Sequence, residues 1–243
     1  MDPADHLNHL RADIDRMLAV PDDAYGNAVA NCPGWTVKEL MEHVAGVYAF
    51  ATNNLAARPG AELRMDVPVA VGLEGRALFE RRAGELLDHL EEVDPTEHRP
   101  NWAGLPTAEF YFRRMAQESA VHRWDAQLAV ADPEPIPTAQ AVDGVDELFE
   151  VFLGPWAKAR GTVGEGESVH LHATDAEDIE GGEWTVTFVP DGVDLERAHA
   201  KAQMAAKGTA SDLLLFAWNR RPVGLDVFGE PDLLDWWPDR VAI

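Results

Sequence analysis

Residues 32–45 read CPGWTVKELMEHVA and contain the signals that begin a helix. A Pro-Gly turn comes first, and Thr36 with Glu39 three residues later matches a capping box. The apolar residues that follow recur at helical spacing over about residues 36–56. They are Val37, Leu40, Met41, Val44, Val47 and Tyr48. His43 lies at the edge of this apolar stripe, so we expect it to face a neighbouring helix.

The N-terminal part of the chain reads as five helices separated by Pro- and Gly-rich segments. The expected helices cover about residues 4–19, 36–56, 69–92, 107–131 and 138–153. The pattern changes after about residue 155, where residues 168–173 and 184–189 alternate apolar and polar side chains, as half-buried strands do. We expect these two strands to pair as an antiparallel hairpin or meander.

Residues 194–207 are compatible with either a strand or a helix. Beyond them, the pattern predicts a helix over 209–218, a strand over 223–229 and a short helix over 231–237. The chain is therefore predicted to be α+β overall, with a helical domain of residues 1–158 and a small α+β C-terminal domain of residues 159–243.

Composition excludes several function classes. The chain has 243 residues and a formal net charge of −23, which argues against nucleic-acid binding and against an anionic membrane surface. No segment approaches the roughly 18 apolar residues of a membrane helix, and the first residues lack a signal peptide, so we expect a cytoplasmic protein.

Cys32 is the single cysteine. A disulfide within the chain and a Cys-rich zinc site are thus excluded, and Cys32 reads as an ordinary packed or half-exposed residue rather than a reactive thiol.

A candidate metal site comes from the helix over 107–131. Glu118 and His122 are four residues apart and project from one helix face, where they could chelate a divalent cation. Asp125 follows on the same face, as a fourth ligand or, more simply, as a residue that orients an imidazole. Glu118 and His122 would form, together with His43, a set of two histidines and one carboxylate. Such a set suits Zn²⁺ and also Ni²⁺, Fe²⁺ or Co²⁺. Spacing alone favours the alternative, an exposed ion pair and an unrelated edge histidine.

Three segments carry a resemblance to a known family. Residues 32–45, residues 118–125 with their Glu-x-x-x-His-x-x-Asp pattern, and residues 211–220 resemble signatures of the mycothiol-dependent maleylpyruvate isomerase family. The resemblance spans nearly the whole chain. It implies a DinB-like four-helix bundle whose metal, usually zinc, is held at the positions of His43, Glu118 and His122, followed by a small α+β domain.

The resemblance also implies an active-site arginine in the C-terminal domain. That arginine follows a glycine in the family, whereas here Asn219 occupies the glycine position and Arg220 follows it. Arg220 is therefore a candidate catalytic residue that could hold a substrate carboxylate. Arg221 is an alternative, and a plain helix-capping role for Arg220 is equally compatible with the sequence.

The implied activity is an isomerase or S-transferase that uses mycothiol, a low-molecular-weight thiol, on a small electrophile. Two other functions fit the same residues: a metal hydrolase acting through a bound water, and a non-catalytic metal-binding or regulatory protein. We expect a monomer or homodimer. His170 and His172 share a face of a predicted strand, and we interpret them as ordinary surface residues, with a second metal site as the alternative.

Overall fold

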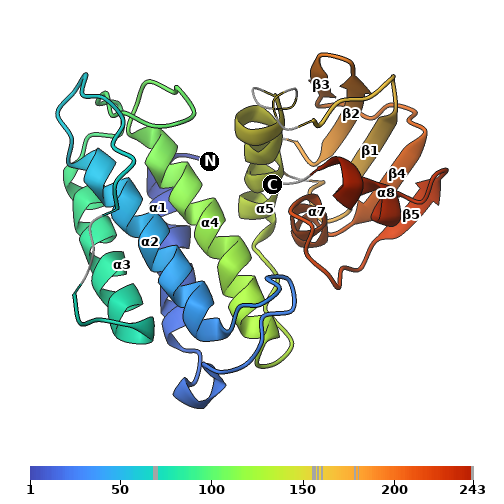
Figure 1. Cartoon of the computed structure of the whole chain (residues 1–243). Coiled ribbons are helices and arrows are strands. Elements are labelled where there is room, and N and C mark those ends of the chain that lie inside the picture. The colour runs from blue at the N-terminus through green and yellow to red at the C-terminus, as the bar shows by residue number, and fades with distance from the viewer. Residues whose placement is uncertain are drawn as a thin grey trace. The chain divides into compact units, whose positions relative to one another are not determined.

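Figure 1 shows a computed structural model of the chain, which describes residues 1–67, 71–154, 157, 159, 161–177, 179 and 181–241. The chain divides into two compact units, Met1–Glu134 and Pro135–Ile243, called here the helical unit and the sheet unit. The predicted α+β class is confirmed. The predicted domain boundary falls at residue 158, outside the described residues. The compact units divide earlier, after Glu134, because the fifth helix packs against a helix of the sheet unit.

The described residues of the helical unit form four α-helices. They are α1 (Pro3–Leu18), α2 (Val37–Leu55), α3 (Gly75–Glu92) and α4 (Glu109–Leu128), with a short 3₁₀ helix at Asp22–Ala24. Helix α2 packs on α3, α1 packs on α4, and α2 also contacts α4. The third helix begins later than predicted. Residues 69 and 70 lie outside the described residues, and Gly72 lies in a turn with a φ of +80°.

The predicted start of α2 is confirmed in detail. The backbone N–H of Thr36 donates to the Glu39 carboxylate at 2.7 Å, and the Thr36 hydroxyl contacts the same carboxylate. This capping box satisfies donors that a helix start otherwise leaves without partners. It therefore fixes where α2 begins, and with it the position of His43 two turns later.

Helix α4 is buried on most of its surface, including many polar residues. Arg123 donates through Nε to Asp13 of α1 at 3.1 Å, and both side chains are almost fully buried. A buried charge needs such a partner, because an isolated one would lose its hydration without compensation.

Among the helices of the described ranges, none is both long and apolar enough for a membrane crossing.

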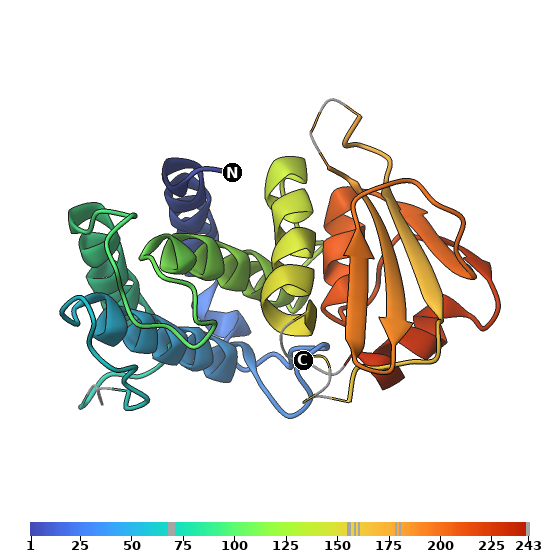
Figure 2. The ribbon, with the colours of Figure 1, turned by 90° about the horizontal axis from the view of Figure 1, so that it is seen from above.

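The sheet unit holds a five-stranded mixed sheet with helices against one face (Figure 2). Its strands are β1 (Ser168–Ala173), β2 (Glu183–Val189), β3 (Gly192–Glu196), β4 (Met204–Gly208) and β5 (Asp226–Gly229), in the order β3-β2-β1-β4-β5. Its helices include α5 (Thr138–Glu147), which continues as the π-helical segment η2 (Leu148–Leu153), α7 (Ala210–Ala217) and α8 (Leu233–Arg240). The predicted antiparallel pairing of residues 168–173 with 184–189 is confirmed, and β1 pairs in parallel with β4.

The two faces of this sheet differ. The apolar face carries buried residues, namely Val169, Leu171, Trp184, Val186, Phe188, Met204 and Ala206. The other face carries polar side chains such as His170, His172, Glu183 and Thr185. The ambiguous segment 194–207 contains the end of β3, a connection and all of β4 except its last residue. Pairing with β1 and β5 outweighs the helix preference of its alanines, because strand formation depends on neighbouring strands.

Candidate metal centre

The structure brings His43, Glu118 and His122 together. His43 Nε2 lies 3.4 Å from Glu118 Oε1, and His122 Nε2 lies 3.3 Å from that same oxygen. The two imidazole rings stand nearly perpendicular, with centroids 5.3 Å apart. One potential ligand atom from each residue lies within 4.8 Å of the others. Two adjacent helices thus direct three donors at one point.

These separations fit a shared divalent cation. Donors about 2.1 Å from a tetrahedral ion lie about 3.4 Å from one another. The two His–Glu distances, 3.4 and 3.3 Å, are close to this value. Three protein ligands would leave one coordination position open to a thiol or a water. The residues present therefore suit a divalent metal, with zinc first and nickel, iron or cobalt as alternatives.

Arg114 fixes the orientation of the Glu118 carboxylate. Its Nη2 donates to Glu118 Oε2 at 2.9 Å, one helical turn earlier on α4. The Arg114 side chain is buried, so its charge is little screened by water. The arginine occupies one carboxylate oxygen, and the other is directed at the two histidines.

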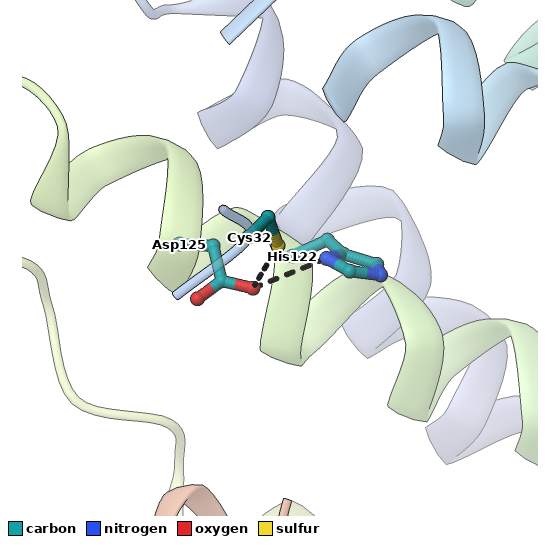
Figure 3. A group of neighbouring side chains, drawn as sticks. All are labelled: Cys32, His122 and Asp125. Carbon is teal, nitrogen blue, oxygen red and sulfur yellow. Dashed lines mark hydrogen bonds and ion pairs between the residues drawn. The ribbon is translucent and has the colours of Figure 1, made fainter. Parts of the chain in front are cut away.

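Asp125 holds His122 from the opposite side of the ring. Its Oδ2 lies 3.2 Å from His122 Nδ1. The Asp125 carboxylate also accepts hydrogen bonds from Asn31 Nδ2 at 3.3 Å and, more weakly, from the Cys32 thiol at 4.0 Å. Figure 3 shows Cys32, from the segment before α2, and His122 both directed at one Asp125 oxygen. A carboxylate on Nδ1 leaves Nε2 available as a ligand atom and sets the orientation of the ring.

Charge interactions dominate the ionisation of this group. Burial raises the pKa of Glu118, but the charge of His122, hydrogen bonds from both histidines and the charge of Arg114 hold that pKa well below its usual range. Burial lowers the pKa of His122, but the charge of Glu118 and the hydrogen bond with Asp125 outweigh it and raise that pKa to about 9. The carboxylates of Glu118 and Asp125 both face the His122 imidazole and favour positive charge there, from a proton or from a bound cation.

The three side chains of the centre differ in exposure. The His43 side chain is 38% exposed, whereas those of Glu118 and His122 are 17% and 9% exposed. The Trp35 ring packs against the His43 imidazole, with centroids 4.8 Å apart. A small molecule could therefore approach from the His43 side, while α4 shields the other two ligands from water.

Arg220 belongs to the sheet unit. Its Nη1 donates at 2.8 Å to the carbonyl of Trp218, the C-cap residue that follows α7, which agrees with the helix-capping role that the sequence left open. Asn219 has a φ of +59°, in the left-handed region that glycine occupies most easily. Asn tolerates this conformation better than most other residues, so Asn219 can hold a turn that a glycine would also adopt. The Arg221 guanidinium lies over the Phe216 ring at 5.0 Å.

Sequence reasoning missed three supporting residues. Arg114 lies four residues before Glu118, and that helical spacing could have identified it. Asn31 and Cys32 reach Asp125 from a loop about 90 positions away in sequence, and no local pattern signals that contact.

Two family models match the chain. The one described as the mycothiol maleylpyruvate isomerase N-terminal domain matches residues 7–127, and the one described as the MDMPI C-terminal domain matches residues 139–235. The chain belongs to the mycothiol maleylpyruvate isomerase family. It is thus a member of a family of enzymes, and the resemblance drawn from its sequence motifs is confirmed.

Solved structures agree with this membership at the level of the fold. A crystal structure of the mycothiol-dependent maleylpyruvate isomerase matches with a TM-score of 0.64 at 19% identity, covering 93% of both chains. A mutant of the mycothiol-dependent maleylpyruvate isomerase with one histidine replaced by alanine matches with a TM-score of 0.65 at 16% identity, again over 93% of both chains. A search of curated proteins found no match.

Proposed function

We propose that this member of the family is a divalent-metal-dependent enzyme that uses mycothiol to isomerise, or to transfer the thiol to, a small electrophile. The observation that carries the proposal is the convergence of His43 and His122 on one oxygen of Glu118. Zinc is the proposed metal, and the helical unit is proposed to be DinB-like. Family membership supports the use of mycothiol.

The chain's own residues would hold and shape the metal site. His43, Glu118 and His122 would bind the metal, and Arg114 would orient the Glu118 carboxylate. Asp125 would accept the Nδ1 proton of His122, so that Nε2 is the nitrogen that faces the metal. When bound, the divalent cation supplies positive charge that favours the thiolate over the thiol. Burial of Glu118 and His122 limits access of water from the α4 side.

The proposed reaction balances without an added oxidant or reductant. The thiolate sulfur forms a bond to one carbon of a conjugated double bond, and the π electrons move onto the conjugated carbonyl oxygen. Rotation about the resulting single bond follows. Breaking the carbon–sulfur bond then restores the double bond as the trans isomer and returns the thiolate. In S-transfer, a proton would instead quench the adduct and the sulfur would stay attached.

Maleylpyruvate, named in the matching isomerase structures, is the first substrate to test. Zinc-loaded protein should convert it to its trans isomer only when mycothiol is present, as followed by absorbance and by mass spectrometry. The same assay on an electrophile panel would detect S-transfer as a thioether product. The matched pair is His122→Ala, which should lose turnover, and His98→Ala, an exposed histidine of the same unit, which should retain it.

Two outcomes would overturn the proposal. Substrate hydrolysis at the same rate with and without mycothiol would indicate a metal hydrolase. Thiol or substrate binding without turnover of any panel member would indicate a non-catalytic binding protein.

A further inference from the structure

Three histidines converge on one carboxylate on the polar face of the sheet. His170 Nε2 lies 3.1 Å from Glu183 Oε2, and His199 Nδ1 lies 2.8 Å from the same oxygen. His172 Nδ1 lies 2.7 Å from the other oxygen, Oε1. The rings of His170 and His199 are 4.7 Å apart and nearly perpendicular. We call these four residues the histidine cluster.

The sheet topology creates this cluster. His170 and His172 share a face of β1, and Glu183 on the antiparallel neighbour β2 is the register partner of His172. The chain leaves β3 at one edge and must cross β2 and β1 to reach β4. The connection between β3 and β4 carries His199 over the polar face, where the Thr185 hydroxyl donates to the Ala198 carbonyl at 2.9 Å. The crossing thus adds a third imidazole to two that the strand already presents.

The donor atoms are suitable for a transition metal. A neutral imidazole offers one unprotonated nitrogen, and the proton can move to the other ring nitrogen. The His199 side chain is 75% exposed, so its Nε2 can hold the ring proton and donate it to a water, which leaves Nδ1 free of a proton for the metal. His172 can keep donating to Oε1, which leaves Oε2 directed at the other two histidines. One ligand atom each from His170, Glu183 and His199 lies within 4.8 Å of the others.

We propose that His170, Glu183 and His199 form a second divalent-cation site, for Zn²⁺, with His172 as the positioning residue. The two His–Glu distances would have to lengthen by about 0.3 and 0.6 Å to reach the roughly 3.4 Å between ligands of a tetrahedral ion. The exposed connection that bears His199 can make this adjustment. Two imidazoles and a carboxylate leave a coordination position for water.

The electrostatic surroundings support a cation. The three imidazoles all direct a ring nitrogen at the Glu183 carboxylate, which concentrates metal-binding atoms at one point. Lys207 on β4 is the register partner of His172, and its charge opposes a cation, although Asp226 stands opposite it on β5. The chain's net charge of −23 also favours cation binding over the molecule as a whole.

Bound zinc would fasten the β3–β4 connection to the sheet. The ligands come from β1, β2 and this connection, three segments joined otherwise by hydrogen bonds. The site would therefore have a structural role, and it is independent of the activity proposed for the helical unit.

Zinc binding to the full chain tests this inference. The group His43, Glu118 and His122 is called here the helical centre. The His122→Ala variant removes one of its ligands, so equilibrium dialysis of this variant against Zn²⁺, followed by elemental analysis, would report on the histidine cluster. We expect about one zinc per chain in this background. Adding His199→Ala should remove it, whereas adding His98→Ala, the exposed-histidine control, should leave it unchanged. His199 is exposed and lies outside regular structure, so its replacement should not disturb folding.

Two results would overturn the inference: no zinc at the histidine cluster in the His122→Ala background, or the same zinc content after His199→Ala. Glu183→Gln provides a second variant of nearly equal size, and it should also abolish binding. The test compares zinc content with and without a change in the histidine cluster. Equal zinc in wild type and His122→Ala would count against the helical centre. Even then, a loss of zinc on replacing His199 or Glu183 would still support the histidine cluster.

Discussion

The helical centre and the site proposed in the histidine cluster, His170, Glu183 and His199, each offer two imidazoles and a carboxylate on different scaffolds. In the helical centre all three residues lie on α2 and α4, and Arg114 and Asp125 hold two of them in place. In the histidine cluster one ligand lies on an exposed connection. The His–Glu distances follow this difference: 3.4 and 3.3 Å in the first group, 3.1 and 2.8 Å in the second.

The two groups differ in how closely their conformation without metal matches the one that would bind an ion. Helices hold the first group close to ligand-like spacing, and a preorganised site binds with less loss of conformational entropy. In the second group the histidines are hydrogen-bonded directly to Glu183, and these hydrogen bonds must break before an ion can bind between them. We therefore expect tighter metal binding at the helical centre than at the histidine cluster.

The largest expected effect comes from Glu118→Gln. The variant removes the charged oxygen shared by both histidines, so metal at the helical centre and thiol-dependent turnover should both be lost. Glu183→Gln is the matched variant, and it should remove zinc from the histidine cluster while leaving turnover intact. Elemental analysis and the maleylpyruvate assay on both variants check this. Turnover that survives Glu118→Gln would break the assignment of activity to the helical centre.

Asp125→Asn should have the next largest effect. An amide in place of this carboxylate no longer holds a charge-assisted hydrogen bond to His122 Nδ1, and loss of such an outer partner weakens metal binding about 10- to 100-fold. Competition with a chelating indicator dye measures the change. Asp88→Asn, an exposed change on α3, is the control and should bind as the wild type does. Unchanged affinity in Asp125→Asn would mean that Asp125 does not position the ligand.

Arg220→Ala tests whether the sheet unit contributes to the chemistry. A charged hydrogen bond to a substrate carboxylate is worth about 1.5–3 kcal/mol, so kcat/KM should fall about 10- to 100-fold with metal content unchanged. Arg220→Lys should recover only part of this loss, because lysine lacks the planar fork. Equal kcat/KM for wild type and Arg220→Ala would mean that the arginine does not contribute to the reaction.

The smallest effect concerns the contact between the two ligand-bearing helices. The Tyr48 hydroxyl on α2 lies 2.6 Å from the Ser119 hydroxyl on α4, and both groups are buried. Tyr48→Phe should lower the free energy of unfolding by about 1 kcal/mol and weaken metal binding a few-fold. Tyr111→Phe loses a similar buried hydrogen bond, to the Pro100 carbonyl, away from the α2–α4 contact. It should cost similar stability without changing metal affinity, as denaturant titration and dye competition would show.

Local signals predicted much of the helical unit. The capping box at Thr36 and the apolar stripe after it determine the start and the inward face of α2, which places His43 beside α4. Helical spacing placed Glu118, His122 and Asp125 on one face. Because these features depend on residues a few positions apart, the sequence was sufficient to predict them.

Contacts between distant segments could not be predicted in the same way. Asn31 and Cys32 reach Asp125 only through the path of the loop before α2. The histidine cluster depends on the crossing between β3 and β4, within a segment that the sequence left open between helix and strand. His199 joins His170 only after β3 and β4 take their places in the sheet, so no local pattern connects them.

Elemental analysis of purified, zinc-dialysed wild type beside His122→Ala tests the central claim most directly. The claim is that His43, Glu118 and His122 hold one divalent ion. It predicts that His122→Ala contains about one ion fewer per chain than the wild type, whatever the histidine cluster binds. Equal metal content in the two proteins would contradict it.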